Sequence, residues 1–418
     1  MDICKLENEL NFFDSQVRRA ALTQLKTAVE SGKVLTAEPS MSHNLHCHTF
    51  YSYNGYNYSP SYIAWLALKS GWFAAGIIDF DVLDAVDEFM AAAKLLKVRG
   101  VCGIETRAFV QELADKEINS PGEPGVAYHV GIGFTTANIP QSQRAFAMEI
   151  KEKAATRTRQ IVELVNPVMG AAALDFDADV MGLTPAGNVT ERHLCLAYRL
   201  KAEKILPDVT ERSAFWCQIL GCASELPSDP VALEAQIRSK TMKKGGPGYV
   251  KADPASFPAL AEMNNFIRAC GALPTIAWLN GDSPGEADPG ALLDLHIQHG
   301  AAMLNIIPER NWNFSDAKLR EKRIGELNRI IAAAKERNMA IVVGTEMNAP
   351  GMKLVDDFEC EALKPHAESF VDGAAIAYAH TVLQVSSRGY FSDWACAEYP
   401  NLVDRNKFYA EYGRRAIV

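Results

Sequence analysis

Two histidines separated by one residue are the most specific chemical feature of this sequence. His46 and His48 stand in the stretch His-Cys-His-Thr, at the end of a short apolar run. Residues two apart on a strand point to the same side, so both imidazoles could bind one ion. Neutral imidazoles combined with carboxylates suit zinc, iron or manganese. A lone His-x-His pair is more often structural, so its meaning depends on what stands beside it.

Further ligand-type side chains lie in or just after other apolar runs. Glu105 ends one run, His129 lies inside the next, and Glu346 follows a run much later in the chain. In barrels of parallel strands, the active site is built at the C-terminal ends of the strands. The sequence therefore predicts a divalent-metal site made by His46, His48, Glu105, His129 and Glu346.

The elements expected to position these residues are seven short apolar strands that alternate with amphipathic helices. The predicted strands are 43–47, 75–79, 100–105, 127–133, 274–278, 302–307 and 340–345, and helices are predicted within 5–35 and over 60–71, 83–97, 287–299 and 316–338. Fully apolar strands alternating with helices indicate a parallel sheet covered by helices. Seven strands favour a closed or nearly closed barrel. The polar link 106–126 shows no helical pattern and fits this alternation badly.

The same reading divides the chain into a barrel interrupted by one insertion. We expect an N-terminal helical segment at 1–40, the two parts of the barrel at 41–139 and 273–350, a mostly helical insertion at 140–272, and a C-terminal helical region at 351–418. The last region either closes the barrel or offers a contact surface to a second copy of the chain, as in a homo-oligomer.

The order of these motifs resembles that of the PHP (polymerase and histidinol phosphatase) superfamily. The resemblance rests on His-Cys-His-Thr, the Gly-Ile-Glu of 103–105, the His-Val-Gly-Ile-Gly of 129–133 and the Gly-Thr-Glu-Met-Asn of 344–348. It covers residues 42–134 and 273–350. It implies a distorted (β/α)7 TIM-like barrel with metal-dependent phosphoester hydrolysis, usually through two or three ions.

Departures from the family pattern reduce the number of ions expected. The resemblance implies that one ion is held by His46, His48, Glu105 and Glu346, whereas only His129 remains for a second ion and almost nothing for a third. We therefore expect one well-made site for zinc, manganese or iron and at most a weaker second. An alternative is a rearranged site made by Glu346, Asn348, Asp79 and Asp282.

Catalytic and substrate contacts are expected at the same rim. We predict catalytic roles for Asp79 and Asn348, and substrate contacts from Arg310, Lys243, Lys244, Trp278 and Asp282. Lys243 and Lys244 lie in a glycine-rich loop that could instead be solvated, and Asp282 is by default a turn residue. Trp278 stands where the family has a ligand, and it would narrow the pocket.

Composition limits the partners. A net charge of -9 argues against nucleic acid and anionic membranes as partners. Nine scattered cysteines without a C-x-x-C pair, and no secretory or membrane-spanning apolar run, predict a cytoplasmic protein with reduced thiols. The leading hypothesis is a metal-dependent hydrolase, a phosphoesterase of a small anionic molecule. The alternatives are hydrolysis of an amide or lactone, or a degenerate barrel that only binds a ligand.

Overall fold

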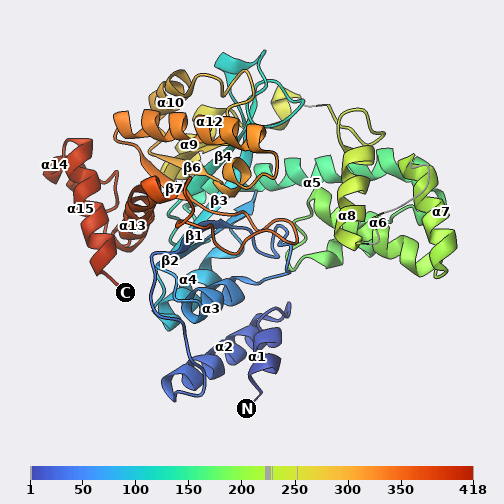
Figure 1. Cartoon of the computed structure of the whole chain (residues 1–418), viewed down its shortest axis with the longest axis horizontal. Coiled ribbons are helices and arrows are strands. Elements are labelled where there is room, and N and C mark those ends of the chain that lie inside the picture. Colours follow the sequence, from blue (N-terminus) through green and yellow to red (C-terminus); the bar gives the residue numbers. More distant parts are fainter. Residues whose placement is uncertain (1, 222–226, 228, 252, 418) are drawn as a thin grey trace.

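Seven strands form one sheet in chain order in the computed structural model, which describes residues 2–221, 227, 229–251 and 253–417 (Figure 1). Cys222 lies outside the described residues. The strands are β1 (His43–Cys47), β2 (Ala74–Phe80), β3 (Gly100–Phe109), β4 (Val126–Ile132), β5 (Leu273–Trp278), β6 (Met303–Ile306) and β7 (Ala340–Val343).

The sheet is nearly closed where the segment after β7 meets the end of β1. The Glu346 amide donates to the His46 carbonyl at 2.7 Å, and the His48 amide donates to the Glu346 carbonyl at 2.8 Å. A side chain at Gly344 would place its Cβ 2.4 Å from the Cβ of His46, so only glycine permits this approach. The predicted distorted seven-stranded barrel is confirmed.

One strand runs against the predicted direction. β4 pairs antiparallel with both β3 and β5, whereas the other neighbouring strands are parallel. The physical reason is the polar link after β3, which contains only the short η1 (Gln111–Leu113) and turns the chain straight back. A parallel return would need a crossover helix, and none is present between these two strands.

Helices surround the sheet and build the two ends of the chain. They are α1 (Ile3–Glu9), α2 (Ser15–Glu30), α3 (Pro60–Lys69), α4 (Val86–Leu96), α5 (Gln141–Met169), α6 (Glu191–Ile205), α7 (Val209–Leu220), α8 (Pro230–Ile237), α9 (Leu260–Ala269), α10 (Pro289–Gln298), α11 (Glu309–Trp312), α12 (Ala317–Glu336), α13 (Ala367–Gln384), α14 (Asp393–Glu398) and α15 (Leu402–Arg415). Shorter 3-10 or π turns are η2 (Gly170–Ala172), η3 (Phe176–Val180), η4 (Met181–Leu183), η5 (Arg238–Met242), η6 (Pro254–Ser256) and η7 (Lys364–His366). Among the described residues, none of the helices combines the length and hydropathy that a membrane span needs.

Alternation along the strands separates two sets of core residues. Side chains such as Cys102 and Ile104 of β3 face out to α3, α4 and α9, and Ile276 and Ile306 face out to α10 and α12. The intervening side chains, such as Val101, share a cluster with the almost fully buried α13. A residue of β3 that lies an even number of positions from Val101, such as Glu105, therefore belongs to the inner face.

The segment between β4 and β5 builds a helical lobe beside the barrel (Figure 1). Its α5 to α8 enclose their own hydrophobic cluster, which includes Tyr198 and Trp216. Two side chains tie the lobe to the rim: Thr184 donates to the Phe50 carbonyl at 3.0 Å, and Asn188 donates to the Phe80 carbonyl at 2.7 Å. The final helix of the segment, α9, packs on the barrel instead.

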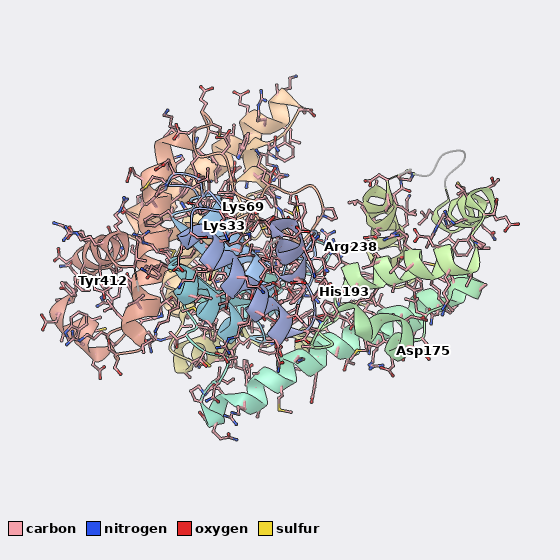
Figure 2. The ribbon with its side chains drawn as sticks, turned by 90° about the horizontal axis from the view of Figure 1, so that it is seen from below. Lys33, Lys69, Asp175, His193, Arg238 and Tyr412 are labelled. Carbon is pink, nitrogen blue, oxygen red and sulfur yellow. The ribbon has the colours of Figure 1, made fainter. Side chains whose placement is uncertain are left out.

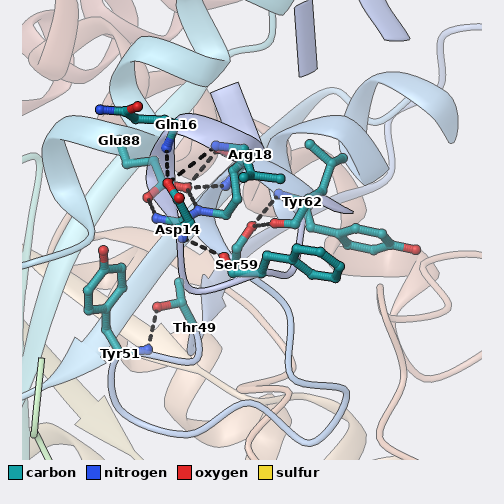
Figure 3. A network of polar contacts seen from close by, with 12 residues as sticks. Asp14, Gln16, Arg18, Thr49, Tyr51, Ser59, Tyr62 and Glu88 are labelled. Carbon is teal, nitrogen blue, oxygen red and sulfur yellow. Dashed lines mark hydrogen bonds and ion pairs between the residues drawn. The ribbon is translucent and has the colours of Figure 1, made fainter. Parts of the chain in front are cut away.

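A buried ion pair holds the N-terminal helices against the barrel (Figure 3). Arg18 of α2 is 1% exposed, and its Nε donates to the Glu88 carboxylate of α4 at 2.8 Å. The same guanidinium donates to the Phe12 carbonyl at 2.6 Å, and the Ser61 hydroxyl donates to Glu88 at 2.7 Å. One cation thus links three segments.

Breaking this ion pair should destabilise the protein. Arg18→Met leaves the Glu88 carboxylate without its buried counter-charge, which costs about 3 kcal/mol of unfolding free energy. Denaturant unfolding of Arg18→Met would measure this loss. The control is Arg19→Met, at an exposed site on the same helix, with an expected change within about 0.5 kcal/mol. Equal stability of the two variants would contradict the role given to Arg18.

The lobe should also contain an acid-sensitive carboxylate. Burial would raise the pKa of Glu191, but Lys243 and Arg238 lower it to about 2. A pKa below the unfolded value means that Glu191 contributes stability at neutral pH that is lost as the pH falls from about 5 toward 2. The difference in Tm between the wild type and Glu191→Gln should therefore shrink across this window. The exposed Glu163→Gln should show no such trend, and a constant difference for Glu191→Gln would refute the assignment.

Candidate metal centre

Three ligand atoms converge on one point at the inner face of the barrel. The Nε2 atoms of His46 and His48 lie 3.3 Å and 3.2 Å from Oε2 of Glu105. All three side chains are buried, and none of these three atoms has a hydrogen-bond partner. Within the described residues, this is the one group of three ligand-type side chains close enough to hold an ion together.

The other nitrogen of His46 is fixed by β6, the strand that pairs with β7 next to the closure of the barrel. Its Nδ1 lies 2.8 Å from Oδ1 of Asn305, on β6. An amide oxygen can only accept, so Nδ1 carries the proton and Nε2 keeps a free lone pair toward Glu105. This is the arrangement that orients a metal-binding histidine.

His48 is oriented through the loop that follows it. Its Nδ1 lies 3.3 Å from the Ser52 hydroxyl, which donates to Asp79 at 2.6 Å. Asp79 also accepts from the Thr49 amide and hydroxyl, each at 2.7 Å. Both oxygens of the Asp79 carboxylate are thus used by the loop. Asp79 thus anchors the loop that carries His48, and its predicted catalytic role stays a prediction.

The electrostatics of the three side chains favour a cation between them. Burial would raise the pKa of Glu105, yet His46 and His48 lower it to about 2. Burial also opposes protonation of His46, but the nearby carboxylates of Glu105 and Glu346 raise its pKa above the usual value. Three buried acceptors at this spacing need a positive charge among them.

Glu346 lies beside this group, held by its own partners. Its Oε2 accepts from Arg310 at 2.5 Å and from the Asn348 amide at 2.6 Å. The backbone adopts left-handed conformations at Glu346 and Met347, with φ of 61° and 54°. Such non-glycine strain is common where a backbone is held for function. Glu346, Asn348 and Arg310 therefore meet at the rim, and the roles predicted for them stay predictions.

His129 is not brought to this group. It pairs with Thr106 across β3 and β4, one position away from Glu105, so it points to the opposite face of the sheet. Its Nε2 lies 2.5 Å from the Asn264 side chain of α9, and its ring stacks on His296 at 5.9 Å. The prediction that His129 binds metal fails because the strand register turns it outward. The basis for a second ion disappears with it.

Two predicted substrate contacts also lie elsewhere. Trp278 is buried in the outer cluster with Ile306 and Leu327, so it does not narrow a pocket. Asp282 forms ion pairs with Lys322 and Arg323 of α12, at 2.7 Å and 2.5 Å. It belongs to the turn before α10 and to no shared site with Glu346.

The glycine-rich loop of the lobe is divided between two environments. Lys243 forms an ion pair with Glu191 at 2.6 Å, whereas Lys244 is exposed beside Gly122. Only Lys243 of the two is held by an ion pair among the described residues.

Several side chains at the mouth were missed from sequence. Phe80 stacks on His48 at 4.1 Å and lies 6.3 Å from Tyr128. Tyr128 pairs with Arg107 across β3 and β4 on the same face as Glu105. Arg107 could have been found because it follows Glu105 by two residues on one strand. Tyr128 could not have been found in this way, because the face of the sheet to which it points depends on how β4 pairs with β3.

Comparisons with known proteins agree with the fold. No family model matches the sequence, and no curated protein matches it. Among solved structures, an amidohydrolase from Chromobacterium violaceum, with bound sulfate and no metal, is similar with a TM-score of 0.50 and 16% identity, covering 79% of this chain and 96% of its own. A candidate metal-dependent phosphoesterase from Bifidobacterium adolescentis has a TM-score of 0.48 and 14% identity, covering 80% of this chain and 98% of its own. At these identities the first likeness shows that the chain shares this barrel fold.

Proposed function

We propose that this protein is a metal-dependent hydrolase that acts on a small phosphorylated molecule. The observation that carries the proposal is the convergence of Nε2 of His46, Nε2 of His48 and Oε2 of Glu105, all buried and all without hydrogen-bond partners. Such a set fits zinc, manganese or iron.

The free lone pairs of the histidine nitrogens make this group suitable for a cation. His46 and His48 each keep a lone pair toward Glu105 because their Nδ1 atoms face Asn305 and Ser52. A divalent cation bound there supplies an acidified water molecule and polarises an oxygen of the substrate. The buried surroundings limit competition from bulk water.

The residues at the rim suit an anionic substrate. Arg310 uses one nitrogen for Glu346, and its side chain is 36% exposed, which leaves further N–H groups for a phosphoryl oxygen. Guanidinium groups beside a metal site favour a phosphoester over an amide, because the phosphoester carries negative charge before and during reaction.

Glu346 and Asn348 have supporting roles in this proposal. Arg310 and the Asn348 amide hold the Glu346 carboxylate in place, so that it can accept a proton from, or orient, the attacking water. Asn348 keeps its buried Oδ1 without a partner, which leaves it able to accept from a substrate or water.

Metal binding is the first test. The purified protein should contain about one divalent ion per chain, and His46→Ala and Glu105→Gln should lose most of it because each removes one of three ligands. Elemental analysis after dialysis measures this. His299→Gln is the matched control, since His299 pairs with Glu112 away from the site. Wild-type protein that binds no metal under any loading condition would refute the proposed function.

Activity on phosphoesters is the second test. A panel of phosphomonoesters, phosphodiesters and amides should show metal-dependent release of product from phosphoesters only. Arg310→Gln should lower kcat/KM by about tenfold to a thousandfold, the cost of one charged contact to the reacting group. Lys322→Gln, an exposed surface cation, should have no effect. Hydrolysis of amides but not of phosphoesters would contradict the proposed phosphoesterase activity and would show that the substrate is an amide.

A further inference from the structure

A cluster of five basic side chains lies where the lobe meets the barrel. Arg107 comes from β3, Arg157 from α5, Arg192 from α6 and Arg238 from η5, and Lys243 comes from the glycine-rich loop. Figure 2 labels Arg238 beside His193, on the side of the lobe toward the barrel, with Asp175 farther out. None of these side chains belongs to the three-residue metal group.

Two carboxylates hold four of the five cations. Glu123 accepts from Arg107 at 2.9 Å and from Arg157 at 2.7 Å. Glu191 accepts from Arg238 at 2.9 Å and from Lys243 at 2.6 Å, through the same oxygen. Each carboxylate is thus shared by two cations, and both are largely buried, with side chains 5% and 16% exposed.

Arg192 has no carboxylate of its own. Within the part of the chain that the structure describes, no hydrogen bond or ion pair is formed by its guanidinium. After burial, the largest influence on the pKa of Arg192 is repulsion by Arg238, and it also feels Tyr53 and the carboxylate of Glu346. Arg192 directly follows Glu191 on α6, so it stands next to the residue whose carboxylate holds Arg238 and Lys243.

The cluster carries more positive than negative charge. Burial followed by the charge of Arg107 lowers the pKa of Arg157, and Arg238 and Arg107 both act against the charge of Lys243, so these cations repel one another. The ion pairs of the cluster use only two carboxylates, Glu123 and Glu191, whereas the nearby Glu346 is already paired with Arg310. Five bases that share two carboxylates in a half-buried place are unfavourable unless an anion from outside completes the group.

We infer that this cluster is an anion-binding subsite, which takes a phosphate or carboxylate group of the substrate other than the group that is hydrolysed. The subsite spans barrel and lobe, because Arg107 belongs to one and Arg192, Arg238 and Lys243 belong to the other. Guanidinium forks match the paired oxygens of either anion. Assigning the anion to the substrate rests on the proposed function, whereas anion binding itself does not.

Calorimetric titration tests the subsite without any activity. Inorganic phosphate and malonate, titrated separately into the full-length protein, distinguish a phosphate subsite from a carboxylate subsite. At least one should bind the wild type and His46→Ala alike, since the metal ligands are not involved. Arg192→Gln should bind about tenfold more weakly, as expected for losing one charge-assisted contact. Because Arg192 holds no other group, this variant should keep the wild-type Tm.

Arg159→Gln is the matched control, because Arg159 lies on α5 but pairs with Asp177, away from the cluster. It should bind the anion as the wild type does. Equal affinity of Arg192→Gln and wild type, or no binding of either anion, would overturn the subsite even if the protein proves to be a metal-dependent hydrolase.

Kinetics then test what the subsite holds. For substrates with a second anionic group, Arg192→Gln should raise KM about tenfold with little change in kcat, the pattern of lost ground-state binding. For substrates whose only anion is the scissile phosphate, KM should stay unchanged. An equal rise in KM for both kinds of substrate would place Arg192 at the scissile group and overturn the assignment of a second anion.

Discussion

The candidate site depends on the two backbone hydrogen bonds that close the barrel between β1 and the segment after β7. They join Glu346 to His46 and to His48 in one short ladder, at 2.7 Å and 2.8 Å. This ladder puts the two histidines and the Glu346 carboxylate at the same rim although they are three hundred residues apart in the chain. The closure also explains Gly344, which lets the two backbones approach, and the left-handed backbone at Glu346 and Met347, which turns the chain away once the ladder is made.

Closure of the barrel brings histidine nitrogens and carboxylate oxygens together in a buried place. Histidine nitrogens and a carboxylate oxygen without partners are costly in a buried place, and a protein keeps them together when another charge is available to them. The surrounding contacts fix these atoms in place: Asn305 sets the proton on His46, and the chain from Asp79 through Ser52 sets the orientation of His48. Side chains on two other strands, β2 and β6, thus serve to present the histidines.

Sequence reasoning succeeded where strand periodicity alone decides the outcome. His46, His48 and Glu105 follow from the alternation of side chains, and the number of strands follows from the apolar runs. Sequence reasoning was wrong where strand direction or packing determines which way a side chain faces. His129 faces outward, contrary to the prediction, because of its register on the antiparallel strand β4, and the sequence signal for that direction was the helix-free link before β4. Trp278 faces outward for a similar reason, since its place in β5 puts it with the outer core.

The sequence predicted Lys243 and Lys244 of the lobe as substrate contacts, but it did not predict the arginines of the cluster, because these come together only through tertiary contacts. The basic residues of the lobe are spread over α5, α6, η5 and a loop, and the contacts of Thr184, Asn188 and Arg157 with the barrel hold them near Arg107. The whole chain is acidic, with a net charge of -9, yet five basic side chains gather where the lobe meets the barrel. A cationic cluster in an acidic protein attracts small anions, while the overall charge repels large polyanions such as nucleic acid. In the function proposed above, the lobe contributes the charges that recognise an anionic substrate, and the barrel contributes the side chains that would hold the metal.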